Sequence, residues 1–233
     1  MKGRIFLLPS SLSEEVNHAY FNPYTTDIIR NTQYFIVEKT KTARRFMKAL
    51  FKDKEIDTCK FFELNKHSDD LDIQYFLNPA LEGNDMAIIS EAGCPGIADP
   101  GSVIVKKAHE KGIRVIPVPG PSSIYMALMA SGFNGQQFEF LGYLSKEQKE
   151  RRRQLQNAER KAQNGISQIF METPFRNMHL LEDTLENCSS STLLCLARNI
   201  TEKDEFIQSQ TIAEWRKQKV DLHKRPCIFI LGN

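Results

Sequence analysis

Long apolar runs, paired cysteines and a strong net charge are all missing from this chain of 233 residues. No stretch approaches the roughly 20 apolar residues that a membrane-spanning helix requires, and the apolar run at the start is too short for a signal peptide. The five cysteines are scattered and form no C-x-x-C pair, which argues against a disulfide framework or a zinc site. We therefore expect the cysteines to be reduced thiols in a cytoplasmic protein that binds no metal.

The common nucleotide-binding and hydrolytic motifs are also missing. There is no G-x-x-x-x-G-K-[ST], which argues against a P-loop NTPase, and no G-x-G-x-x-G followed by an acid, which argues against a dinucleotide-binding fold. Neither a G-x-S-x-G elbow nor an H-E-x-x-H motif appears. The net charge of +2 gives no global basic field of the kind that dedicated nucleic-acid-binding proteins often have.

Glycine and proline, in contrast, are concentrated in one place. Six of the twelve glycines and five of the ten prolines lie between residues 88 and 132. They form two clusters, and each cluster directly follows a short apolar run, Met86–Ile89 or Val115–Val118, of the length of a buried strand. A strand that ends in glycine and proline and leads into a helix is typical of a ligand-binding loop in an α/β protein.

The first cluster is built to be stiff. Gly93, Gly96 and Gly101 lack a Cβ atom and allow sharp turns or close backbone approach to a ligand, whereas Pro95 and Pro100 fix φ and remove amide donors. A stiff loop loses less ordering entropy when a ligand binds. The alternative interpretation is that both clusters are ordinary tight turns, although two such turns about 25 residues apart, each after a strand, make that interpretation weaker.

The two clusters resemble a known family. Residues 90–101, Ser-Glu-Ala-Gly-Cys-Pro-Gly-Ile-Ala-Asp-Pro-Gly, are similar to the S-D-A-G-x-P-x-x-x-D-P-G signature of the tetrapyrrole-methylase-like S-adenosylmethionine methyltransferases. They are closest to the branch that 2′-O-methylates a cytidine ribose in 16S ribosomal RNA. Residues 115–123, and Phe138–Leu144 with Lys146 and the Arg151–Arg152 pair, resemble further motifs of that branch.

The resemblance implies an architecture and a ligand. It implies two α/β domains, residues 1–118 and 119–233, each with a mixed sheet flanked by helices and with a cleft between them. It further implies S-adenosylmethionine as cofactor, a homodimer and small-subunit RNA as partner. The implied cofactor-binding residues are Pro9, Ser90, Ala92, Gly93, Cys94, Pro95, Ile97, Gly120, Pro121, Ser122, Ser123, Met171, Glu172 and Ala197.

The expected chemistry is a one-step displacement, because the methyl group of a sulfonium is already activated. A ribose hydroxyl must also lose its proton, and Glu172, Glu91 and Glu38 are the candidate proton acceptors. Two alternatives stay open: methylation of a tetrapyrrole or another small molecule, and a non-catalytic protein of the same fold that binds the cofactor or RNA.

Several positions depart from the pattern of the family. The stretch after the first expected strand, Pro9–Glu15, lacks the family's glycine and offers helix N-cap chemistry instead. Lys39 replaces an acid, Phe175 a histidine and Asn199 a glutamate. His67 resembles a family histidine, although a lone histidine is more often structural.

The polar segment 146–161 has two interpretations. Its basic and acidic residues at helical spacing are typical of a solvated helix with i,i+4 pairs. Arg151–Arg153 could instead contact RNA phosphates, which would fix the register of the RNA without reading its sequence. The first interpretation is favoured.

Overall fold

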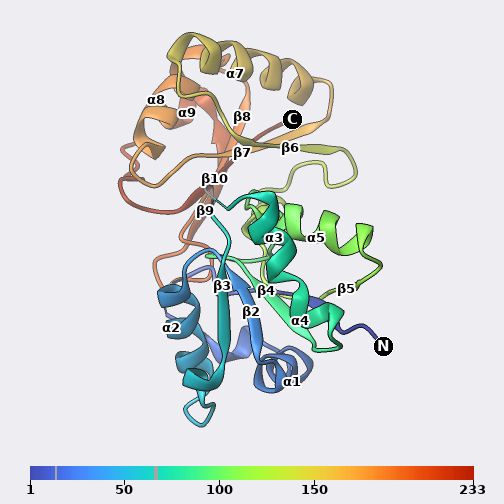
Figure 1. The fold of residues 1–233 in the computed structure, drawn as a ribbon. Helices are drawn as coiled ribbons and strands as arrows, with labels where there is room; N and C mark the ends of the chain where they lie inside the picture. The colour runs from blue at the N-terminus through green and yellow to red at the C-terminus, as the bar shows by residue number, and fades with distance from the viewer. Residues whose placement is uncertain (14, 66–67) are drawn as a thin grey trace. The chain divides into compact units, whose positions relative to one another are not determined.

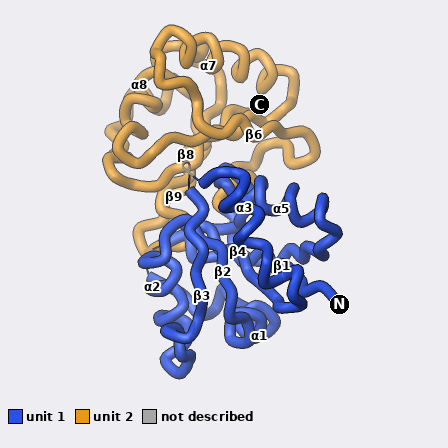
Figure 2. Tube along the Cα trace, in the orientation of Figure 1, with its two compact units in different colours: residues 1–122 blue, residues 123–233 orange. Residues whose placement is uncertain are grey.

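The chain divides into two compact units, Met1–Ser122 and Ser123–Asn233 (Figure 2). The computed structural model describes residues 1–13, 15–65 and 68–233, so the prediction for His67 lies outside the described residues. The domain boundary expected from the sequence, between residues 118 and 119, falls in the turn that precedes the observed division. Each unit has its own sheet and its own hydrophobic core.

Within the described residues, the first unit contains a five-stranded sheet with the order β3-β2-β4-β1-β5 (Figure 1). All its strand pairs are parallel. Its strands are β1 (Arg4–Leu8), β2 (Tyr34–Val37), β3 (Lys60–Glu63), β4 (Met86–Ile89) and β5 (Arg114–Pro117). Its helices are α1 (Pro23–Asn31), α2 (Thr40–Leu50), α3 (Asp70–Phe76), α4 (Asn78–Leu81) and α5 (Gly101–Glu110), with short 3-10 turns at His18–Tyr20 and Ile56–Thr58.

The α/β architecture is confirmed, but the expectation of a mixed sheet is wrong for this unit. Each connection between successive strands contains at least one helix and crosses over the sheet, and a crossover joins parallel strands. The two glycine- and proline-rich turns follow β4 and β5, which are not direct neighbours. Both strands pair with β1, so the segment after β1 lies between the two turns.

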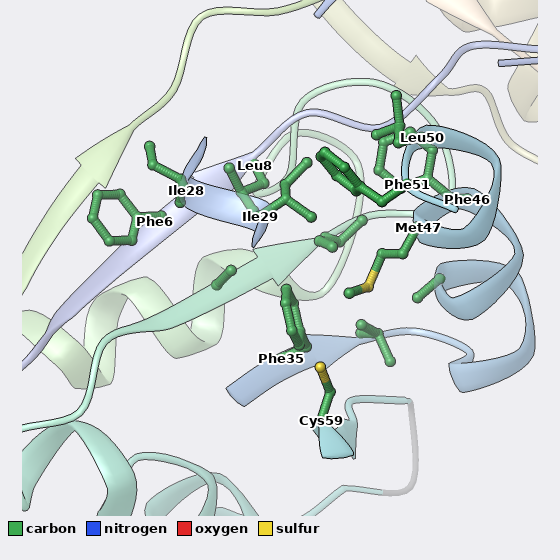
Figure 3. Packing of buried hydrophobic residues seen from close by; sticks show 14 of the residues in the cluster. Phe6, Leu8, Ile28, Ile29, Phe35, Phe46, Met47, Leu50, Phe51 and Cys59 are labelled. Carbon is green, nitrogen blue, oxygen red and sulfur yellow. The ribbon is translucent and has the colours of Figure 1, made fainter. Parts of the chain in front are cut away.

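Helices cover both faces of the first sheet. Alternating residues of the strands face one core with α1 and α2, where Phe35, Met47 and Ile29 are fully buried (Figure 3). The other residues, such as Ile5 and Ile36, face a second core with α3, α4 and α5. The apolar residues Ala43, Phe46, Met47 and Leu50 of α2 recur at helical spacing, and all four are buried. The chain therefore leaves β1 and β4 toward opposite faces, which is the topological switch point where open α/β sheets bind ligands.

The second unit, all of whose residues are described, has a mixed sheet with the order β6-β7-β10-β8-β9. β6 and β7 are parallel, and the other pairs are antiparallel. Its strands are β6 (Phe138–Tyr143), β7 (Ser167–Met171), β8 (Leu193–Arg198), β9 (Phe206–Thr211) and β10 (Cys227–Gly232). Its helices are α6 (Ser123–Ser131), α7 (Gln148–Gln163), α8 (Asn177–Asn187) and α9 (Ile212–Trp215).

The helix start expected within Pro9–Glu15 is not observed among the described residues of that stretch. The hydroxyl of Ser13 instead donates to the carbonyl of Glu15 at 2.7 Å. The first α-helix begins only at Pro23, where the side chain of Asn22 accepts from the amide of Thr25 at 2.9 Å. Pro121 lies before α6, which begins at Ser123.

Candidate functional site: the turns after β4 and β5

The turn after β4 is held in an unusual backbone conformation. Gly93, Gly96 and Ala98 all have positive φ angles, +72°, +85° and +61°. The carboxylate of Asp99 accepts from the amides of Gly96 at 2.9 Å and Gly101 at 2.7 Å, which fixes the turn from within. An alanine in the left-handed region is strained, and such strain concentrates at functional sites.

The two turns contact each other and the segment after β1. The thiol of Cys94 donates to the carbonyl of Pro121 at 3.3 Å, and the amide of Ser10 donates to the carbonyl of Gly93 at 2.9 Å. A Cβ atom on Gly120 would lie 2.0 Å from Cγ of Pro9. The sequence-predicted residues Pro9, Gly93, Cys94, Gly120 and Pro121 are therefore brought together at one edge of the sheet.

Gly93→Ala tests this contact, with Gly96→Ala as its matched control. Both positions have positive φ, so each alanine carries left-handed strain of about 1–2 kcal/mol. The Cβ of Ala at position 93 would also meet Leu12 Cδ2 at 3.0 Å and Pro121 O at 3.2 Å, whereas no described atom lies within 4 Å at position 96. We expect Gly93→Ala to lower the free energy of unfolding by about 1 kcal/mol more than Gly96→Ala. Equal losses in urea denaturation would show that the turns are not in contact.

Two carboxylates follow adjacent strands at the same edge. Glu38 comes directly after β2 and Glu91 after β4, and the amide of Glu91 donates to Oε1 of Glu38 at 3.3 Å. Burial raises the pKa of Glu38, and the nearby carboxylates of Asp99 and Glu91 raise it further. Nζ of Lys39 lies 3.4 Å from Oε2 of Glu91. The lysine that replaces the family's acid therefore neutralises part of this acidic edge.

The free energy of unfolding of Glu38→Gln, relative to that of the wild type, is expected to be higher at neutral pH than in acid. A carboxyl group with a raised pKa binds more protons when folded, so its contribution to stability falls as pH rises from its usual value of 4.5 through the raised value. Glutamine removes this titration but keeps an oxygen for the amide of Glu91. Denaturation of the variant and the wild type at about pH 4 and about pH 7 measures the difference. Exposed Glu82→Gln is the control, and a pH-independent difference for Glu38→Gln would contradict the burial of Glu38.

The candidate residues of the second unit lie at its strand ends. Met171 ends β7, and the carboxylate of Glu172, 7% exposed, accepts from the amide of Thr173 at 2.7 Å and pairs with Arg176. Ala197 is buried in β8. Glu172 is thus engaged by its own turn, unlike Glu38 and Glu91.

The family departures in the second unit have local physical reasons. Asn199 has a φ of +51°, a conformation that asparagine tolerates better than glutamate, and its Nδ2 donates to both carboxylate oxygens of Asp204 at 3.0 Å. Phe175 is 67% exposed, with the ammonium of Lys224 5.8 Å from its ring centre.

A cavity of about 250 Å³ lies at the carboxyl ends of β1 and β4. Of the residues predicted from the sequence as site residues, Ser90 and Glu91 line it. Ser10, Thr42 and Arg45 also line it, and the sequence did not mark them, since they come from separate segments and belong to no motif. Among residues 1–13, 15–65 and 68–233, no metal-binding group of three His, Cys, Asp or Glu side chains is found, and no helix has the length and apolarity needed to cross a membrane.

The fold and the site define an α/β protein with a ligand-binding edge at the switch point of its parallel sheet. The family model described as "Tetrapyrrole (Corrin/Porphyrin) Methylases" matches residues 22–215. This chain belongs to that family.

Relatives and a solved structure agree with the assignment. "Ribosomal RNA small subunit methyltransferase I" of Buchnera aphidicola subsp. Schizaphis graminum is 33% identical over 171 residues, which cover 72% of this chain and 59% of the relative. The protein of the same name from Vibrio cholerae is 32% identical over 188 residues, covering 81% and 62%. The chain thus spans less than two thirds of the length of these relatives. The crystal structure of the methyltransferase CobJ matches with a TM-score of 0.66 at 19% identity, covering 99% of this chain and 94% of that one, which confirms the fold.

Proposed function

We propose that this protein is an S-adenosylmethionine-dependent methyltransferase that acts on a ribose 2′-hydroxyl of small-subunit ribosomal RNA. The observation that carries the proposal is the pair of contacting turns after β4 and β5, with positive φ angles at Gly93, Gly96 and Ala98, of which Ala98 is strained. Two relatives named as small-subunit ribosomal RNA methyltransferases support the choice of acceptor.

The residues present fit this cofactor. Ile97 exposes 41% of its surface on the strained turn and offers an apolar contact. The carboxylate of Glu91 is one third exposed at this edge and lies next to that of Glu38, whereas the carboxylate of Asp99 is engaged by the amides of Gly96 and Gly101. The sulfonium and the amino group of S-adenosylmethionine are cations, which the carboxylates of Glu91 and Glu38 suit. We assign its binding to Pro9, Ser90, Ala92, Gly93, Cys94, Pro95, Ile97, Gly120, Pro121, Ser122, Ser123, Met171, Glu172 and Ala197.

The cofactor, when bound, supplies the activated methyl group. The protein's own residues then have to hold the acceptor hydroxyl in line and receive its proton. We assign proton acceptance to the pair of Glu91 and Glu38, because burial raises the pKa of Glu38 toward the range of a general base. Glu172 positions its own turn through Thr173 and Arg176.

The remaining expectations belong to the same proposal. The family resemblance supports a homodimer in the cytoplasm, and methyl transfer from a sulfonium requires no metal. Light scattering after size-exclusion chromatography tests the dimer, and a monomer at all micromolar concentrations would contradict it.

Mass spectrometry of ribosomal RNA from a strain lacking this protein tests the function. We expect one ribose methyl group of the small subunit to be missing and to be restored when purified protein and S-adenosylmethionine are added to subunits from that strain. An unchanged methylation pattern would contradict the proposal. Methyl transfer to uroporphyrin III instead of RNA would establish a tetrapyrrole acceptor, and binding of the cofactor without any transfer would establish a non-catalytic protein.

A further inference from the structure

Positive charge is concentrated in one short segment of the first unit, although the chain as a whole is close to neutral. Residues 39–54 contain seven of the 31 lysines and arginines but only one of the 29 aspartates and glutamates. The segment consists of α2 and the residues that flank it. The rest of the chain therefore carries a net negative charge, and the first unit has a local basic surface that the total of +2 does not reveal.

The inner face of α2 is already packed inside the first unit. Phe46, Met47 and Leu50 are buried in the core that α2 shares with the sheet (Figure 3). A basic amphipathic helix that binds a membrane has to insert its apolar face, and in α2 that face is covered by the sheet. A partner of α2 can therefore reach only its charged outer face.

Most cations of this segment are engaged within the protein. Arg44 and Lys39 form salt bridges, and Lys54 donates to two backbone carbonyls. Arg45 has an interaction partner as well. The amide of Thr40, at the amino end of α2, donates to a carboxylate at 2.7 Å. Neither these side chains nor the end of the helix is open to an anion.

Three lysines of the segment remain. Lys41, Lys48 and Lys52 are exposed, and none of them forms a salt bridge within residues 1–13, 15–65 and 68–233. The pKa of Asp57 is lowered chiefly by Arg44, and Lys48 makes only the smallest contribution to this shift. Lys41 and Lys48 are seven residues apart, so they lie on one side of α2 and about 10 Å apart along its axis. Lys52 follows the end of the helix.

The three lysines suit the phosphates of a single RNA strand. An ammonium group is a compact charge on a flexible stem, and it pairs with phosphate oxygens without reading a base. The spacing of Lys41 and Lys48 corresponds to about three nucleotide steps at a rise of roughly 3.4 Å per step. Phe46 and Phe51, the aromatic residues of the segment 39–54, are both buried, so a base finds no surface for stacking there.

We propose that Lys41, Lys48 and Lys52 hold the phosphate backbone of the RNA acceptor along α2. Lys41 follows Glu38 by three residues, so a strand bound there leads to the edge where Glu38 and Glu91 lie. The inference rests on the proposed function and adds a surface that binds the substrate away from the reacting atoms. The contacts are independent of base sequence, so a scrambled RNA depends on them to the same extent.

The variant that combines Lys41→Gln, Lys48→Gln and Lys52→Gln tests this surface. Glutamine is about as good a helix former as lysine, and all three positions are exposed, so the unfolding temperature should not change. The probe is a fluorescein-labelled single-stranded RNA of the small subunit, titrated with the full chain at several salt concentrations. We expect the slope of log K against log salt to become shallower by about 2, since one phosphate of a single strand accounts for about 0.7. At about 0.1 M salt the affinity should fall about a hundredfold.

The variant that combines Lys106→Gln, Lys217→Gln and Lys219→Gln is the matched control. These lysines are also exposed, and their loss lowers the net charge of the chain by the same three units. Lys106 lies on α5, which covers the other face of the first sheet, and the other two belong to the second unit. Because salt screens distant charges, the control should bind the RNA at most about twofold more weakly than the wild type. Equal losses in the two variants would overturn the proposal.

Methylation kinetics separate this surface from the proposed function. The variant that lacks the three α2-segment lysines should have a raised KM for RNA but an unchanged kcat, because these lysines do not touch the reacting atoms. Its affinity for S-adenosylhomocysteine should equal that of the wild type. If the wild type methylates RNA and both variants share its KM, the surface is overturned and the function stands. If the wild type methylates no RNA but loses RNA affinity only with these three lysines, the methyltransferase assignment fails and the surface stands.

Other polyanions provide the last comparison. Vesicles of phosphatidylserine and polyglutamate carry negative charge without a nucleic-acid backbone, and each is titrated under the same conditions as the RNA. We expect the wild type to bind the RNA more tightly than either of them. Preference for the vesicles or for polyglutamate would assign the surface to a membrane or to an acidic protein and would overturn the proposal.

Discussion

Gly120→Ala is expected to lower the free energy of unfolding by about 3 kcal/mol or more. The added Cβ would lie 2.0 Å from Cγ and 2.4 Å from Cβ of Pro9. Such distances require the turn after β5 to move away from β1, because the ring of Pro9 has few ways to yield. The two segments are held at this spacing by the parallel pairing of β1 with β5. Urea denaturation of the variant and the wild type gives the difference.

Gly135→Ala is the matched control for this substitution. No described atom lies within 4 Å of its added Cβ, and its φ is not in the left-handed region. Its stability should change by less than about 0.5 kcal/mol or rise slightly. Because Gly120 is also assigned to the cofactor site, Gly120→Ala should weaken cofactor binding even at a temperature where the variant is folded. Equal stabilities of the two alanine variants would mean that Pro9 and Gly120 are not in contact.

Arg151→Met is expected to destabilise the protein by about 3 kcal/mol, by removing the partner of a buried carboxylate. Nε of Arg151 donates to Oδ2 of Asp183 at 2.7 Å, and the side chain of Asp183 is 5% exposed. Nη1 of the same arginine donates to the carbonyls of Ser145 and Lys146 at 3.0 and 2.9 Å. Asp183 retains only weaker partners once the guanidinium is lost, among them Arg152 at 3.7 Å.

Arg153→Met shows what the loss of an exposed arginine on α7 costs. Its side chain is 83% exposed and lies 3.8 Å from Glu150, so the expected change is within about 0.5 kcal/mol. Thermal and urea unfolding of both variants provide the comparison. A similar small effect for Arg151→Met would contradict the buried pair. A large effect would mean that Arg151 anchors α7 to α8. Arg151 would then have a structural role, and an RNA-phosphate contact in this segment would fall to its exposed neighbours.

The sequence predicts well the elements whose pattern is local. β4 is a run of four apolar residues, all buried, between turn residues, and its bounds are those expected. α2 follows its helical spacing, since its apolar face has a sheet to pack against. β9 was missed, because only Phe206 and Ile207 of Phe206–Thr211 are apolar and the strand is half-buried throughout, and an edge strand needs no continuous apolar run.

The part of the site that the sequence did not predict depends on which strands pair with each other. The sequence marked the turns after β4 and β5, but it did not reveal that β1 lies between their strands. The residues of a strand do not determine which strand pairs with it, because the strand order depends on the crossover connections of the whole unit. For the same reason Arg45 and Thr42 were not predicted to meet Ser10 and Glu91, because the cavity exists only after three distant segments have folded together.

Calorimetric titration with S-adenosylhomocysteine tests the central claim, that the contacting turns of the first unit bind the cofactor. We predict a dissociation constant on the order of micromolar for the wild type. Ile97→Arg should lose binding at least about tenfold, because it replaces an exposed apolar contact with a cation beside the assigned ligand position, and its unfolding temperature should be unchanged since Ile97 packs against little. No heat of binding with the wild type, or equal affinities for the wild type and Ile97→Arg, would contradict the claim.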